Sequence, residues 1–117
     1  KNYLKNKYKT SIIPCKTIRN KSKIALSSRN NLLDLNGIKK ASFLSKSLIK
    51  LKKNLANCKQ IKQSLRIQIK NFEKFLKINI EYLELRSIKN LKISNTIRGS
   101  RLFVAYYIDN VRLIDNF

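Results

Sequence analysis

The feature that most constrains this chain is its surplus of positive charge. Its 117 residues include 27 lysines and arginines but only 6 aspartates and glutamates, so the formal net charge is +21. In isolation, so many like charges repel one another and oppose a compact state. A polyanionic partner removes this penalty, and a phosphate backbone is the commonest such partner. The charge therefore predicts a nucleic-acid-binding protein with one small domain and additional basic segments.

Two other interpretations of the charge stay open. An anionic membrane surface also attracts basic chains, but membrane binding normally requires an amphipathic helix with a strongly segregated basic face. No apolar run approaches the roughly 20 residues that a membrane-spanning helix requires. The remaining alternative is a basic soluble protein without a polyanionic partner. Of the three, we favour nucleic acid and expect no membrane partner.

The sequence offers little to catalysis. It contains no histidine, and its acids are scattered; Glu81 and Glu84 lie three residues apart, a spacing more typical of a solvated helix face than of a carboxylate pair. The only glycines are Gly37 and Gly99, too few for a glycine-rich phosphate loop. Two cysteines, far apart and without histidine, cannot complete a tetrahedral zinc site. We therefore predict that the protein is not an enzyme and needs no cofactor or metal.

We expect three parts along the chain: a basic extended arm over residues 1–31, a helical domain over 32–101 and an apolar tail over 102–117. The arm has scattered lysines, the only proline and no sustained apolar period, so a partner rather than a core is expected to order it. The tail contains two apolar runs on either side of Asp109 and Asn110. These runs are consistent with a short hairpin, but we favour an irregular tail that packs on a neighbouring protein.

Apolar residues at intervals of three and four predict helices in the middle part. One stripe follows Gly37, and a second lies within residues 57–76; their members are Ala41, Leu44, Leu48, Leu51 and Leu55, and Ile61, Leu65, Phe72 and Leu76. Residues 77–79 form a plausible break, because Asn79 suits a helix N-cap. A third helix is expected over residues 80–93, with a less regular stripe. The predicted fold class is mainly α, with three helices.

Arg98-Gly99-Ser100-Arg101 is the sharpest local feature for RNA binding. A glycine allows close backbone approach to phosphate, and the planar guanidinium of arginine matches phosphate oxygens. Within the arm, two tyrosines are flanked by lysines, a pattern typical of side chains that stack on bases and contact phosphates; these residues are Tyr3, Lys5, Lys7, Tyr8 and Lys9.

Ser87-Ile88-Lys89-Asn90-Leu91, followed by Arg98-Gly99-Ser100-Arg101, resembles the third helix and the turn after it in the universal small-subunit ribosomal protein S-thirteen family. Upstream, Leu35-Asn36-Gly37-Ile38-Lys39 is similar to the glycine turn that opens a helix in that family. The resemblance covers roughly residues 32–101 and implies a helix-two-turns-helix domain. Lys39 stands where the family has a second glycine.

The resemblance implies a structural protein of the small ribosomal subunit that binds rRNA in the head, lies beside ribosomal protein S-nineteen and approaches the large subunit at a bridge. The family's basic C-terminal tail, which implies tRNA contact, is absent, so tRNA contact is doubtful. Abundant lysine, asparagine and isoleucine indicate an AT-rich genome and a mitochondrial ribosome. The expected rRNA contacts, besides the arm residues, are Gly37, Lys39, Lys40, Arg86, Lys89, Arg98, Gly99 and Arg101. The alternatives are another organellar ribosomal or RNA-packaging protein, or a basic membrane-associated interaction protein.

Overall fold

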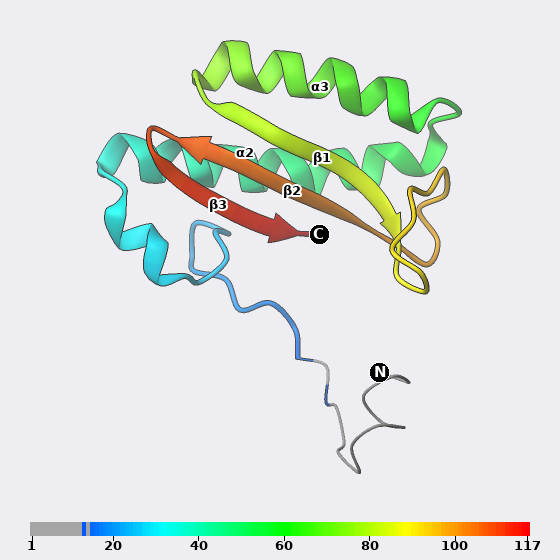
Figure 1. The fold of residues 1–117 in the computed structure, drawn as a ribbon, viewed down its shortest axis with the longest axis horizontal. Coiled ribbons are helices and arrows are strands. Elements are labelled where there is room, and N and C mark those ends of the chain that lie inside the picture. Colours follow the sequence, from blue (N-terminus) through cyan, green and yellow to red (C-terminus); the bar gives the residue numbers. More distant parts are fainter. Residues whose placement is uncertain (1–12, 14) are drawn as a thin grey trace.

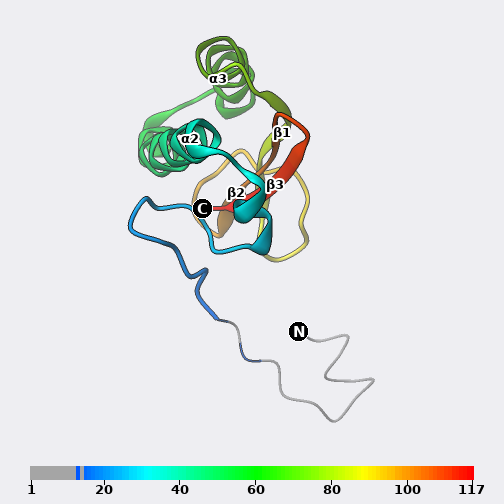
Figure 2. The same ribbon diagram turned by 90° about the vertical axis from the view of Figure 1, so that its left-hand side faces the viewer.

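Two long helices cover one face of a three-stranded antiparallel sheet (Figures 1 and 2). The computed structural model of the protein describes Ile13 and residues 15–117. The strand order is β1-β2-β3, so consecutive strands are neighbours. The elements are η1 (Ser28–Leu32), α2 (Leu35–Asn54), η2 (Leu55–Asn57), α3 (Ile61–Leu76), β1 (Asn79–Ser87), β2 (Ser100–Ile108) and β3 (Val111–Asn116).

Helix α2 begins earlier than the sequence predicts. The side chain of Asp34 accepts a hydrogen bond from Gly37 N at 2.6 Å, which satisfies one of the free backbone N–H groups of the first turn. Gly37 therefore lies inside the helix rather than in a turn before it. A Cβ at this glycine would lie 3.3 Å from Cγ2 of Ile108, so the absence of a side chain lets α2 approach β2 closely. The predicted apolar stripe of this helix is buried.

Helix α3 also buries its predicted stripe, and it ends where the sequence predicts a break. Lys77 adopts a left-handed conformation with φ +50°, which stops the helix and turns the chain back. The Glu73 carboxylate accepts a hydrogen bond from Ile80 N at 2.9 Å and so links the end of α3 to the start of β1. This contact fixes the reversal between helix and sheet.

The predicted third helix is wrong, because residues 79–87 form strand β1. Leu83 and Leu85 face the core, whereas Tyr82, Glu84 and Arg86 are only partly buried; this alternation has the period of two that a strand requires. The bulge between Ile80 and Tyr82 interrupts the alternation at its start. Residues 88–99 then form a loop rather than the end of a helix.

The irregular apolar tail is likewise wrong, and the hairpin alternative is what the structure shows. Strands β2 and β3 pair antiparallel across a turn at Asp109 and Asn110. Asp109 has φ +52°, a left-handed conformation that aspartate tolerates better than most residues. The apolar side chains of β2 that face the helices form the centre of the core; they are Leu102, Val104, Tyr106 and Ile108.

The mainly α, three-helix fold class is therefore corrected to an α/β fold with two helices on one face of a three-stranded antiparallel sheet. Helices α2 and α3 and all three strands share one hydrophobic core, to which Ile24 also belongs. No helix among the described residues is both long and apolar enough to span a bilayer.

Candidate functional site

Residues 19–32 form a mostly irregular segment that ends in the short helix η1. This segment lies along strand β3 and is held there by an ion pair. Arg19 donates two hydrogen bonds to the Asp115 carboxylate, at 2.7 and 2.8 Å, and a third to the Asn116 carbonyl at 2.9 Å. The guanidinium also lies over the ring of Phe117, 4.5 Å from its centroid. The Asp115 side chain is only 5% exposed and that of Arg19 18% exposed, so solvent screens this pair weakly.

The same segment is also tied to the core and to helix α2. A tight reversal pairs Arg19 with Ala25 and inserts Ile24, which is 3% exposed, into the core. The Ser42 hydroxyl of α2 donates to the Ser22 carbonyl at 2.9 Å. The segment is thus fixed from the sheet side and from the helix side, although the sequence predicts an extended arm that only a partner would order.

The anchored segment presents a polar turn, Ser27–Asn30, which includes the start of η1. The Asn30 side chain donates to the Ala25 carbonyl at 3.0 Å, and Ser27 Oγ accepts from Arg29 N at 3.2 Å. Ser27, Ser28 and Arg29 are exposed. Within residues 15–117 no carboxylate pairs with Arg29. The turn therefore carries an unpaired arginine and two exposed serines on a backbone that these bonds hold in place.

A cavity of about 240 Å³ lies between this turn and the sheet. Ser27, Arg29 and Asn30 contribute its polar lining, and the apolar lining comes from both the segment and the strands, including Ile24, Leu26, Leu113 and Ile114. Tyr106 lines its inner end. Burial, and to a smaller degree the negative charge of Asp115, raises the pKa of Tyr106 above its ordinary value, while Arg19 acts in the opposite direction. The cavity therefore combines an apolar wall with a cationic rim, a lining suited to a ligand with an anionic group.

The structure does not bring the residues predicted to bind RNA together. Gly37 is buried in α2, while Lys39 and Lys40 lie further along that helix, Lys39 exposed and Lys40 half-buried. Arg86, on β1, is paired with Glu84 and also donates to the Leu91 carbonyl at 2.7 Å. These positions therefore lie on different elements, helix α2 and strand β1.

The remaining predicted contacts lie on the loop after β1 or outside the described residues. Lys89, Arg98 and Gly99 are exposed on the loop, where Gly99 has φ +70°, and Arg101 on β2 donates to the Asn116 side chain at 2.7 Å. The predicted contacts of the arm fall among residues 1–12, outside the part of the chain that the structure describes: Tyr3, Lys5, Lys7, Tyr8 and Lys9.

Comparison with known proteins decides the family. Residues 3–117 match the family model described as pantoate-beta-alanine ligase. Pantothenate synthetase from Flavobacterium psychrophilum is 33% identical over 115 residues, covering 96% of this chain and 40% of that protein. The enzyme from Clostridium acetobutylicum is 38% identical over 111 residues, covering 91% of this chain and 38% of that one. This chain belongs to the pantoate–β-alanine ligase family.

Solved structures of the family have the same fold. A pantoate–β-alanine ligase from Francisella tularensis, described as complexed with beta-gamma ATP and β-alanine, is 28% identical with a TM-score of 0.68, covering 99% of this chain and 36% of that one. Pantothenate synthetase from Thermus thermophilus has a TM-score of 0.74 at 23% identity, over 99% of this chain and 43% of that one, and shows the fold alone. This chain thus spans about 40% of the length of the ligases it matches.

These findings overturn the functional prediction. The resemblance to the ribosomal protein S-thirteen family rested on short glycine and arginine patterns, whereas the ligase family matches nearly the whole chain. The predictions of a structural ribosomal protein, of rRNA, ribosomal protein S-nineteen and a large-subunit bridge as partners, and of a mitochondrial ribosome are wrong. The prediction that the protein is not an enzyme is also wrong, because the family consists of ligases. The RNA-packaging and membrane-associated alternatives are also wrong, because the family that matches the chain is one of ligases.

Sequence reasoning missed Ser27, Ser28 and Arg29 as a site. The stretch shows serine and asparagine around one arginine, which looks like an ordinary loop. Its distinguishing property is the anchorage by Arg19 and Asp115, which are 96 residues apart in the sequence. No local pattern reveals such a contact.

Proposed function

We propose that this chain forms part of a pantoate–β-alanine ligase and that its Ser27–Asn30 turn binds the phosphate groups of ATP. The observation that carries the proposal is the family match over residues 3–117, together with an exposed arginine on an anchored turn. The choice of ATP as the ligand follows the Francisella tularensis ligase, which was solved as a complex with beta-gamma ATP and β-alanine. Phosphate is the most highly charged group among these ligands, so it gains most from a free guanidinium.

The turn has the groups that such binding requires. The planar guanidinium of Arg29 can donate two parallel hydrogen bonds to phosphate oxygens. Ser27 Oγ accepts from a backbone N–H, so its own hydroxyl hydrogen remains available to a ligand. Joining a carboxylate to an amine requires activation of the carboxylate, and ATP supplies the driving force for that step. These residues act by holding the phosphates in place and by stabilising their negative charge.

The turn is one part of a larger site. Its cavity of about 240 Å³ is smaller than the pockets that usually enclose drug-sized ligands. ATP together with two further substrates needs more surface than the turn offers. We infer that other parts of the ligase complete the site, since this chain corresponds to about 40% of its relatives' length.

A chimaera tests the proposal. This chain would replace the matching 40% of the Flavobacterium psychrophilum enzyme, and pantothenate formation from pantoate, β-alanine and ATP would be measured. We expect the chimaera to be active and Arg29→Gln within it to lower kcat/KM by about 100-fold, the loss typical of removing a charge-stabilising donor. Arg98→Gln, which removes the same charge from another exposed loop position, is the matched control and should have little effect. A folded chimaera in which both variants have equal activity would contradict the role of the turn.

A further inference from the structure

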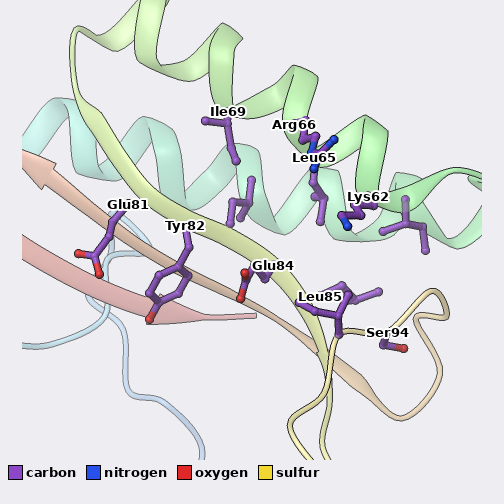
Figure 3. A pocket seen from close by; sticks show the side chains of 12 residues that line it. Lys62, Leu65, Arg66, Ile69, Glu81, Tyr82, Glu84, Leu85 and Ser94 are labelled. Carbon is purple, nitrogen blue, oxygen red and sulfur yellow. The ribbon is translucent and has the colours of Figure 1, made fainter.

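A second cavity lies in the groove between helix α3 and the edge strand β1, away from the Ser27–Asn30 turn (Figure 3). Its volume is about 260 Å³. Leu65 and Ile69 point from α3 toward β1 in Figure 3, so the groove has apolar walls. The remaining apolar lining residues come from both elements and from the loop after β1: Ile61, Leu83, Leu85 and Ile93. A cavity of this size fits a compact ligand.

The rim of this groove has unpaired positive charge. Lys62 and Arg66 lie one turn apart on α3 and are exposed, and no carboxylate within residues 15–117 pairs with either. Glu81 and Glu84 of β1, which border the groove, already form ion pairs with other arginines. Figure 3 shows their side chains pointing away from α3. The groove is therefore cationic in spite of the two neighbouring carboxylates.

Two arginines of the sheet, one on β3 and one on β1 itself, hold those carboxylates. Arg112 donates to Glu81 at 2.7 and 2.9 Å, which keeps the pKa of that carboxyl below its ordinary value. Arg86 lies 2.6 Å from Glu84. Neither glutamate is thus free to pair with the cations of α3. An anionic ligand in the groove would therefore meet two cations that no carboxylate of the described residues pairs with.

The strand edge adds hydrogen-bonding groups to the groove. Ser94 N donates to the Leu85 carbonyl and Ser87 N to the Lys92 carbonyl, so residues 85 and 87 direct their backbone groups away from β2. Because this direction alternates along a strand, Leu83 presents its N–H and C=O to the same side. No group among the described residues bonds to them there. One donor and one acceptor therefore face the cavity that Leu83 lines.

We propose that this groove binds a compact N-acylated amino acid, a small molecule with a branched apolar body, a secondary amide and a free carboxylate. The amide exchanges hydrogen bonds with Leu83 N–H and C=O, the apolar body packs on Leu65 and Ile69, and the carboxylate lies against Lys62 and Arg66. Each of the three groups of the ligand thus meets a matching group in the groove. The product of joining pantoate to β-alanine is itself an amide with a free carboxylate, so it belongs to the same broad class.

A longer peptide fits the groove less well. Ile93 already pairs with Arg86, and Ser94 bonds to Leu85, so the loop occupies the strand edge directly beyond Leu83. An added β-strand needs several consecutive free residues on that edge, and here only a short stretch remains. The free part of the β1 edge offers one N–H and one C=O, which is enough to bind one amide group.

Binding of N-acetyl-leucine to the 117-residue chain tests the inference. NMR amide shifts of Leu83 and Leu85 should change saturably, with a dissociation constant in the millimolar range expected for so small a ligand. N-acetyl-leucinamide, which lacks the carboxylate, should bind about tenfold more weakly. The double variant Lys62→Gln/Arg66→Gln should lose affinity to a similar degree. Lys70→Gln/Lys74→Gln, with the same charge change at exposed positions of α3 outside the groove, is the matched control.

Three outcomes would overturn the inference: shifts confined to other residues, equal weakening by the two double variants, or equal binding of the acid and its amide. Ile69→Trp, which fills the groove without a change of charge, should abolish the shifts of Leu83 while the chain stays folded. Pantothenate serves as a second probe in the same titration. This titration contains no ATP and leaves Arg29 unchanged. A negative result in it therefore does not affect the proposed role of the Ser27–Asn30 turn, and a negative result in the chimaera assay does not affect the proposed groove.

Discussion

Two irregular segments of this chain each present an exposed arginine, yet they are held in different ways. Residues 19–32 carry Arg29 and are anchored across the molecule by the ion pair between Arg19 and Asp115. Residues 88–99 carry Arg98 and are held by bonds to nearby residues, such as Ser100 Oγ to Ser94 Oγ at 2.8 Å. Three apolar side chains of the second segment remain more than half exposed: Ile88, Leu91 and Ile93.

The contrast shows what distinguishes a binding turn from an ordinary loop. A largely buried ion pair carries a desolvation cost, and it places the backbone accurately only when its hydrogen bonds are complete. The first segment meets that condition, since Arg19 makes bonds to Asp115, Asn116 and the Lys23 carbonyl. The loop has a more conspicuous sequence, Arg98-Gly99-Ser100-Arg101, but no comparable anchor. This anchorage, rather than the sequence pattern, is the reason why we propose Arg29 and not Arg98 as the phosphate-binding arginine.

The largest expected effect comes from removing the anchor. Asp115→Asn leaves the guanidinium of Arg19 largely buried beside a neutral partner, which should lower the free energy of unfolding by about 3 kcal/mol. Urea unfolding followed by circular dichroism measures this change. Asp109→Asn removes the same charge from the exposed turn between β2 and β3 and should change stability by less than about 0.5 kcal/mol. Similar midpoints for the two variants would show that the ion pair does not hold the segment.

A smaller effect concerns Tyr106, which the anchored segment helps to bury. Its pKa is raised in the folded protein, so above its ordinary value of about 10 the unfolded chain loses the tyrosine proton while the folded chain keeps it. The contribution to stability is therefore complete below about pH 10 and falls as pH rises beyond it, by up to about 1.4 kcal/mol per pH unit. Tyr106→Phe should remove this dependence. Parallel stability curves of wild type and variant through the alkaline range would mean that Tyr106 is accessible to water.

The sequence predicted the two helices because their packing is local and periodic. The stripes that begin at Ala41 and Ile61 repeat every three or four residues, and both are buried. Strand β1 was misread because Leu85, Ile88 and Leu91 also recur at intervals of three. Only the pairing of Leu83 with Val104 and of Leu85 with Leu102 resolves the ambiguity, and that pairing depends on a strand distant in the sequence.

The hairpin and the site were harder to predict for related reasons. The run Phe103–Ile108 is apolar on both faces, so its alternation is hidden and periodicity alone cannot identify a strand. The excess positive charge predicts a nucleic-acid partner. A small ligand with phosphate groups is also bound by an unpaired arginine, so charge alone does not distinguish the two. The lack of histidine argues against catalysis by this chain. However, a chain that corresponds to about 40% of the length of its relatives need not contain every catalytic group of the ligase.

The most direct test of the account is the affinity of the 117-residue chain for ATP, measured by calorimetry for Arg29→Gln and for Arg98→Gln. Both variants remove one exposed positive charge, so a general attraction of the nucleotide to a +21 chain would weaken equally in each. If the anchored turn binds the phosphates, Arg29→Gln should weaken binding by about tenfold and Arg98→Gln by less than about twofold. Equal losses in the two variants, or a larger loss in Arg98→Gln, would contradict it.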